Sequence, residues 1–367
     1  MQSSAKFPDI HLYRVQKNIA NFGGDPSRVT IAGQSFGSSQ VYHAVNSALF
    51  KGYFHGAISE SGIRYPYDTL VAGLATSYVN MSMALEFGQN YTTSHNVSTI
   101  AELRNLTTAE LMDGSSDRVT SEYFSNVTAL STNYPLIFKP VLDGYVLPER
   151  YIDQLLSGPA NDVPLITGNT KDESGASTSL DLYTPSEYTD YCTQKYGNLT
   201  AEYLTLYPAG NDTESASRSW NAAATDTSLV STWLYARDWV LRSNATSPIY
   251  TYYWDHAPPG QDEGAFHQSE IMYVLNALYA NAETYPFTWD DYDIQEVMSA
   301  YWVNFIRTGN PNNGGAYPFD NLTHWAPNDG VTKTVMELGD GWGNHTLTNT
   351  DKRQTLIEEY FAQQSPY

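Results

Sequence analysis

The segment VTIAGQSFG, residues 29–37, decides the fold. Its first four residues form a short, uncharged, β-prone run, as expected of a strand buried on both faces of a parallel sheet. The last five fit GxSxG, in which a serine lies on a tight turn from a strand into a helix. We expect Gly33 and Gly37 to be needed because side chains there would crowd the turn and the helix behind it. The pattern therefore predicts Ser35 as a nucleophile, the alternative being a serine that only caps the helix.

The segments on either side of this turn predict a strand–helix–strand unit. Residues 11–22 have apolar positions at helical spacing, and the Gly-Gly-Asp-Pro run at 23–26 ends that helix. After the turn, residues 38–50 have helical character, and residues 56–59 predict the next strand. A unit of this kind indicates an α/β fold with a mostly parallel central sheet and flanking helices.

The remainder of the chain continues the same alternation. Residues 163–167 and 249–254 predict further strands, and residues 294–308 form the clearest helical pattern. A polar helical or loop-rich excursion is expected around 70–135 and a helical insertion around 184–247. Because no repeat or low-complexity linker divides the chain, we predict one α/β domain over residues 1–367.

Composition excludes several classes of function. Nineteen basic and forty acidic residues give a net charge of −21, which repels nucleic acid and anionic membrane surfaces. No apolar run is long enough to cross a bilayer, so we predict no transmembrane segment. The single cysteine, Cys192, excludes an intrachain disulfide and any zinc site built on paired thiolates.

Glycosylation sequons are unusually frequent. Ten are present where composition predicts about four to five by chance, which indicates a secreted glycoprotein. The first residues, MQSSAKFPDIHLYR, lack the apolar stretch of a secretory signal, so we expect that the natural N-terminus lies upstream of Met1. The sequon asparagines are Asn80, Asn90, Asn96, Asn105, Asn126, Asn198, Asn211, Asn244, Asn321 and Asn344.

A serine nucleophile needs a base, and histidine is the side chain whose pKa suits that task. His43 and His55 lie in elements behind the serine, whereas His256 and His267 follow the strand 249–254. His267 is the better candidate because it lies in a strand-to-helix loop, in the chain order nucleophile, acid, base that this fold uses. The others, His11, His95, His324 and His345, lack a strand-end context.

The acid should lie between the serine and the histidine, just after a strand. Asp172 and Glu173 both satisfy this condition, and the residue pattern alone does not separate them. A metal-dependent hydrolase is disfavoured because the chain has no HExxH-like spacing.

Several segments together resemble one known family. NFGGDPSRVTIAGQSFG, GAISESG, TGNTKDESG, DEGAFHQSEIMYVL and YWVNFIRTGNPN, in that order, resemble the type-B carboxylesterases and lipases, which include the cholinesterases. The resemblance spans essentially residues 12–327 and implies the α/β-hydrolase fold. It implies a Ser-His-Glu triad of Ser35, His267 and Glu173 that hydrolyses carboxylic esters through an acyl-enzyme.

The resemblance also implies other properties of the site. The backbone N–H of Phe36 would donate to the oxyanion, and Ser61 and Gln34 would lie behind the reacting groups. The family uses no cofactor, and no metal site is expected. The expected partner is a small-molecule or lipid ester; acyl and alcohol specificity and the oligomeric state stay open.

The chain departs from the family in four ways. The family's glutamate before the serine is Gln34, its alanine after the serine is Phe36, and its glycine after the acid is Ser174. In addition, only 34 residues precede Ser35, whereas the family has several strands and a Gly-Gly oxyanion loop there. We therefore expect a fold without the N-terminal strands, an unpaired apolar sheet edge, and weakened or absent activity. The alternative function is a non-catalytic, cholinesterase-like binding or adhesion protein.

Overall fold

A six-stranded sheet forms the centre of the structure, a computed structural model that describes residues 7–73, 77–117, 136–315 and 322–367. The strand order is β1-β2-β5-β6-β7-β8; all neighbours are parallel except β7 and β8, which are antiparallel. This confirms the predicted mostly parallel sheet, but the sequence analysis did not identify β7 or β8. The strands are β1 Thr30–Gln34, β2 Gly56–Glu60, β5 Leu165–Thr170, β6 Ile249–Trp254, β7 Thr334–Leu338 and β8 Gly343–Thr346.

Helices cover both faces of this sheet. Ala57, Leu165 and Ile249 are in register across three strands and pack against α2 (Phe36–Asn46), α6 (Tyr151–Ser157) and α9 (Thr213–Leu241). The residues that follow them, Ile58, Ile166 and Tyr250, point to the opposite face, because successive side chains of a strand alternate. There they pack against α10 (Ile271–Val274) and α11 (Trp289–Thr308). Two apolar layers thus hold the strands, as the uncharged strand patterns predict.

The strand before Ser35 does not have the burial that its sequence predicts. β2 is buried at all five positions, whereas β1 is partly buried and Ala32 is exposed. The prediction of a strand buried on both faces is therefore wrong for β1. The reason is its place in the sheet: within the described part of the chain, β1 pairs with β2 alone and forms one edge.

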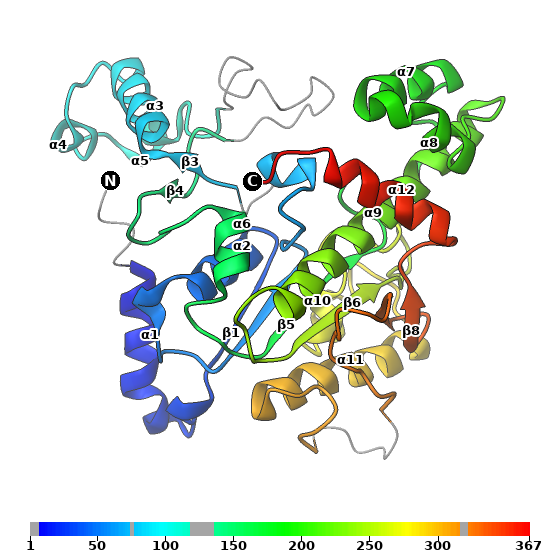
Figure 1. Cartoon of the computed structure of the whole chain (residues 1–367). Helices are drawn as coiled ribbons and strands as arrows, with labels where there is room; N and C mark the ends of the chain where they lie inside the picture. The colour runs from blue at the N-terminus through cyan, green and yellow to red at the C-terminus, as the bar shows by residue number, and fades with distance from the viewer. Residues whose placement is uncertain (1–6, 74–76, 118–135, 316–321) are drawn as a thin grey trace.

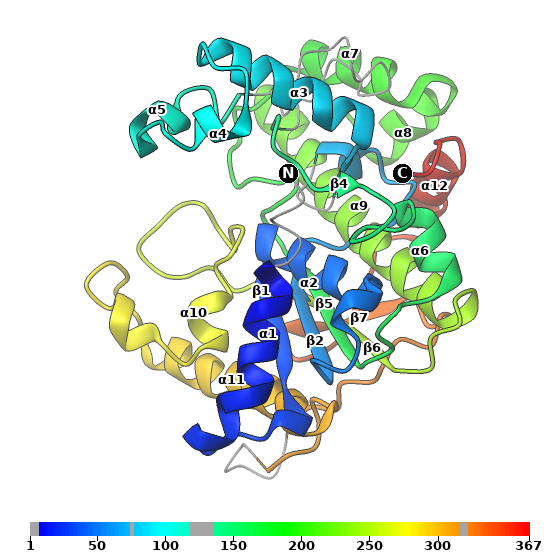
Figure 2. The ribbon, with the colours of Figure 1, turned by 90° about the vertical axis from the view of Figure 1, so that its left-hand side faces the viewer.

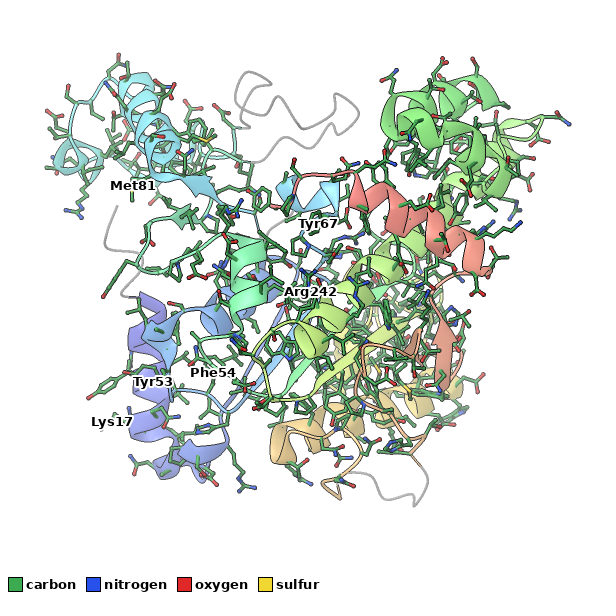
Figure 3. The ribbon with its side chains drawn as sticks, viewed as in Figure 1. Lys17, Tyr53, Phe54, Tyr67, Met81 and Arg242 are labelled. Carbon is green, nitrogen blue, oxygen red and sulfur yellow. The ribbon has the colours of Figure 1, made fainter. Side chains whose placement is uncertain are left out.

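The helix α1 (Phe7–Asn18), continued by a 3-10 turn at Ile19–Phe22, lies beside this edge (Figures 1 and 2). The Gln16 amide connects it to the core by donating to the carbonyls of Pro26 and Tyr53, at 2.8 and 2.9 Å. Figure 3 shows Tyr53 and Phe54 near α1, and Lys17 on the outer side of that helix. The predicted helix over 11–22 therefore exists but begins at Phe7.

The remaining helices gather above the sheet in Figure 1. The region around 70–135 contains α3 (Met81–Ser94), α4 (Ile100–Leu103) and α5 (Thr108–Met112), with β3 (Val79–Asn80) paired to β4 (Val141–Leu142). The region 184–247 is helical, with α7 (Pro185–Tyr196), α8 (Thr200–Leu206) and α9, and α12 (Asp351–Ala362) packs against α9. Residues 118–135 of the predicted excursion, and the sequons at Asn126 and Asn321, lie outside the described residues. Along the described ranges, every helix is too short or too polar to cross a bilayer.

The two glycines around Ser35 have different roles. A Cβ placed on Gly33 would lie 2.3 Å from the backbone oxygen of Gly37, so strand and helix approach each other too closely for any side chain. A Cβ on Gly37 would meet nothing within 4 Å. The prediction that a side chain at Gly37 crowds the turn is therefore wrong. Gly37 supplies the backbone that Gly33 must approach, and its own Cα hydrogen faces open space.

Replacement of Gly33 by alanine is expected to lower the free energy of unfolding by at least about 1–3 kcal/mol, because the new methyl group collides with rigid backbone. Gly37→Ala is the matched control. It should leave stability unchanged or raise it slightly, because alanine reduces the entropy of the unfolded chain. Urea denaturation of both variants measures the difference, and equal midpoints would contradict this account of the turn.

Candidate active site

Ser35 lies between β1 and α2 in a backbone conformation that few residues adopt. Its φ of 56° and ψ of −114° turn the chain sharply from strand to helix, a strained geometry that concentrates at functional sites. Its backbone N–H donates to the carbonyl of Glu60 at 2.9 Å, which ties the turn to the end of β2. The Ser35 hydroxyl forms no capping hydrogen bond with α2. The geometry therefore disfavours the capping alternative and leaves the hydroxyl available for chemistry.

Glu173 and His267 are 94 positions apart in sequence and meet directly. The Glu173 Oε2 atom lies 2.5 Å from His267 Nδ1. The second oxygen of Glu173 accepts from the backbone N–H of Thr170 at 2.9 Å, so the end of β5 fixes the carboxylate. Glu173 is buried, whereas the His267 side chain is 44% exposed. A buried carboxylate thus orients a histidine whose other face is open to solvent.

Asp172, the other candidate acid, contacts the backbone of the same loop instead. Its Oδ2 accepts from the backbone N–H of Ala265 at 2.8 Å, and its own N–H donates to the Ala265 carbonyl at 3.0 Å. These bonds hold the loop that carries His267 against the end of β5. Glu173 contacts the imidazole and Asp172 secures the loop, a division of roles that the residue pattern alone left open.

The electrostatics of this pair suit a general base. The hydrogen bond that His267 donates to Glu173 raises the pKa of His267, partial burial opposes that rise, and the charge of Glu173 adds to it. With Nδ1 donating to Glu173, Nε2 carries the free lone pair. The histidine is therefore oriented to accept a proton on the side away from Glu173.

Gln34 is a second polar neighbour of the His267 imidazole. Its amide nitrogen lies 3.2 Å from Nε2 and 3.4 Å from Nδ1 of His267. Nearly equal distances to both ring nitrogens place the amide over the face of the ring rather than in line with either lone pair. Among the hydrogen bonds of the described residues there is none between Ser35 and His267. Catalytic hydrogen bonds are often long in unliganded enzymes and tighten with substrate, so this geometry does not exclude the pair.

The two remaining predicted residues lie close to the serine. Phe36, at the first position of α2, is 58% exposed, and backbone N–H groups at a helix start have no partner within the helix. Ser61 follows β2, has a φ of 53°, and its N–H donates to the carbonyl of Gly168. Among the described residues, the buried Ser61 hydroxyl has no hydrogen-bond partner.

His256, the alternative base, links two segments of the fold through its side chain. Its Nδ1 lies 2.6 Å from a carboxylate oxygen of Asp340, and its Nε2 lies 2.9 Å from one of Asp291, at the start of α11. Because each ring nitrogen contacts a carboxylate, His256 joins the β7–β8 turn to α11 and presents neither nitrogen to a nucleophile.

A buried ion pair supports the acid loop and was not identified from the sequence. The guanidinium of Arg64 donates to Asp68 at 2.6 Å, and both side chains are almost completely buried. Arg64 also donates to the hydroxyls of Ser174 and Ser228, at 3.0 and 2.9 Å. Ser174 follows Glu173 and has a φ of 56°, so Arg64 stabilises a strained residue beside the acid. Arg64 and Asp68 lie outside any helix, so their spacing of four residues gave no signal for this pair.

Removing one charge of this pair is expected to destabilise the protein strongly. Asp68→Asn leaves the Arg64 guanidinium buried without its counter-ion, which costs about 3–5 kcal/mol of unfolding free energy. Glu214→Gln is the control, since it breaks an exposed pair with Arg218 and should change stability by less than about 1 kcal/mol. Urea denaturation measures both, and equal shifts would contradict the structural role of Arg64.

Comparisons with known proteins show which family the chain resembles. The model of the carboxylesterase family matches residues 10–355. Carboxylesterase 4A of Bos taurus is 28% identical over 330 residues, which are 83% of this chain and 57% of that protein. Carboxylesterase 1E of Rattus norvegicus is 30% identical over 87% of this chain and 57% of its own length. Para-nitrobenzyl esterase of Bacillus subtilis is 25% identical over 94% of this chain and 65% of its own length. The chain thus spans slightly more than half the length of most curated relatives it matches.

Proposed function

Because the chain belongs to the carboxylesterase family and therefore has the α/β-hydrolase fold, we propose that it hydrolyses carboxylic esters through an acyl-enzyme on Ser35. His267 Nε2 accepts the proton as the Ser35 oxygen attacks the ester carbonyl, then returns it to the leaving alcohol. Water attacks the acyl-enzyme with the same assistance and releases the acid. Glu173 holds the imidazole and stabilises its charged form.

One observation carries this proposal: the 2.5 Å contact of Glu173 with His267, on a loop tied to the end of β5. The free hydroxyl of Ser35 lies at the end of β1, and Gln34, the residue before it, touches the imidazole. These contacts support the proposal because they lie at the carboxyl ends of parallel strands, where α/β sheets bind their ligands.

Covalent labelling tests the proposal. A fluorophosphonate is expected to modify one residue per chain, with the added mass on the peptide that contains Ser35. Prior incubation with a short-chain nitrophenyl ester should slow labelling, because substrate and probe compete for one nucleophile. Labelling confined to another serine, or no labelling of folded protein, would contradict the proposal.

We further propose that this chain turns esters over slowly. The start of α2 supplies the Phe36 N–H, one of three oxyanion donors that the family resemblance implies, but neither Gly-Gly pair of the chain is placed to supply the other two. Gly23–Gly24 precedes β1, at the end opposite Ser35, and Gly314–Gly315 follows α11, whose end at Gly309 packs near Pro164 before β5. Each missing donor costs about 100- to 1000-fold in rate.

A comparison of two chains tests this second proposal. Hydrolysis of a nitrophenyl ester by this chain is expected to be on the order of 10⁴-fold slower than by the same chain extended with its in-frame upstream sequence, if two donor losses add. Equal values of kcat/KM would contradict it. No turnover by either chain, with no labelling of Ser35, would favour the non-catalytic binding protein.

We also propose that the protein is exported and glycosylated. All eight sequon asparagines within the described residues are exposed, and four of them lie on or beside α3 and α4: Asn80, Asn90, Asn96 and Asn105. Expression in a secretory host should give glycopeptides at these positions by mass spectrometry. Secreted protein without glycans would contradict the proposal.

A further inference from the structure

Two glutamates behind the triad are buried without any cation. Glu60, the last residue of β2, is 4% exposed, and Glu270, three residues after His267, is fully buried. None of the ion pairs among the described residues involves either one. Burying an unpaired carboxylate costs so much free energy that such a group normally takes up a proton instead.

The contacts of the two side chains fit neutral acids. Glu60 Oε1 accepts from the indole N–H of Trp302 at 2.7 Å, and Glu270 Oε1 accepts from the hydroxyl of Tyr252 at 3.2 Å. The second oxygen of Glu270 is buried and accepts no hydrogen bond. A carboxylate normally collects donors at both oxygens, so one uncharged donor for each group stabilises a negative charge poorly.

Glu60 contacts the turn that carries Ser35, and Glu270 lies on the segment that carries His267. The backbone carbonyl of Glu60 accepts the N–H of Ser35. Glu270 lies three residues after His267, at the end of the same loop. The titratable groups that act on the pair are Glu173, His267 through Glu173, and the Tyr252 hydroxyl. Three carboxyl groups thus share one low-dielectric region, and repulsion between them must be relieved by protons.

We propose that Glu60 and Glu270 are protonated positioning residues, which leave Glu173 as the single buried carboxylate facing His267. In their neutral form they let the end of β2 and the His267 loop pack together. Their ionisation at higher pH places like charges between these segments and displaces the base from Ser35. The positioning role, which is read out by labelling of Ser35, rests on the proposed esterase function. The protonation of the two glutamates does not.

The pH dependence follows from the direction of each shift. Burial raises the pKa of Glu60 to about 7, and burial with repulsion from Glu60 and Glu173 raises that of Glu270 well above its ordinary range. An unfolded glutamate titrates near about 4.3. Between these values the native state binds more protons, so stability is full below about pH 4 and falls as pH rises through the native pKa.

Thermal unfolding of wild type, Glu60→Gln and Glu270→Gln at about pH 5 and about pH 8 tests the protonation. Glutamine has the shape of a protonated glutamate, so at about pH 5 each variant should unfold close to the wild-type temperature. At about pH 8 the variants should become more stable than wild type, because they have no acid to ionise. Glu296→Gln, on the exposed face of α11, is the control and should show no pH-dependent gain. If the unfolding temperatures of all four proteins changed by the same amount between the two pH values, the proposal would be overturned.

Two further measurements keep the outcome clear. The infrared band of a protonated carboxylic acid should be present in wild type at about pH 6 and weaker in each glutamine variant that folds; its absence from wild type would overturn the protonation. The labelling rate of wild type should fall above about pH 7, whereas that of Glu60→Gln should stay level. Identical labelling profiles would overturn the positioning role, and no labelling at any pH refutes the esterase proposal alone, since the unfolding result stands without it.

Discussion

Replacement of Ser35 by alanine will abolish fluorophosphonate labelling and lower ester hydrolysis by up to about 10⁶-fold, limited by the activity of the wild-type chain. The reason is chemical: in the proposed mechanism the Ser35 oxygen forms the covalent bond to the acyl group, and alanine has no group to replace it. Labelling measured by mass spectrometry and hydrolysis of a nitrophenyl ester report the two effects separately. A variant that labels as fast as wild type would refute the assignment of the nucleophile.

Ser61 provides the matched control for this experiment. It is also a serine with positive φ directly after a parallel strand, and β1 and β2 are neighbours in the sheet. Its hydroxyl is buried without a partner, so Ser61→Ala removes an unsatisfied polar group and no contact. We expect Ser61→Ala to label within about tenfold of wild type. If Ser61→Ala lost labelling and Ser35→Ala did not, the two serines would exchange roles.

The second large effect is expected at the acid. Glu173→Gln should lower the labelling rate of Ser35 by about 10⁴-fold, because an amide favours the wrong imidazole tautomer and cannot stabilise its charged form. The same change should lower the pKa of His267, since the hydrogen bond to Glu173 is what raises it. Labelling rates over a range of pH measure both effects. The inflection in the variant's curve of labelling rate against pH should lie at lower pH than that of wild type.

Asp172→Asn separates this effect from damage to the loop. Asp172 precedes Glu173 and holds the backbone of Ala265, and the oxygen of asparagine can still accept that N–H. The variant is expected to lose at most about tenfold in labelling rate and to keep the wild-type inflection. Equal losses in the two variants would mean that the loop position, and not the Glu173 carboxylate, sets the reactivity.

The local chain predicted the elements around the nucleophile well. The strand and helix flanking Ser35, the strand at Ile249–Trp254 and the helix that ends at Thr308 follow from short-range patterns, and the structure has each of them. Strand β8 was missed because it is short and partly polar, with alternating exposure. Strand β7 was also missed, although it is as long as β1 and β2. Burial of β1 was predicted wrongly because a strand pattern does not state how many neighbours the strand has.

For the site, the sequence by itself predicted Ser35 and His267 as nucleophile and base, because each residue follows a strand within a recognisable local pattern. The tertiary structure decided between Asp172 and Glu173: adjacent residues on one loop point in different directions, and only the fold brings the imidazole to one of them. It also decided that Glu60, Glu270, Arg64 and Asp68 are buried together with the acid loop. Burial of a charged side chain depends on which distant segments cover it, and that information is spread over the whole chain.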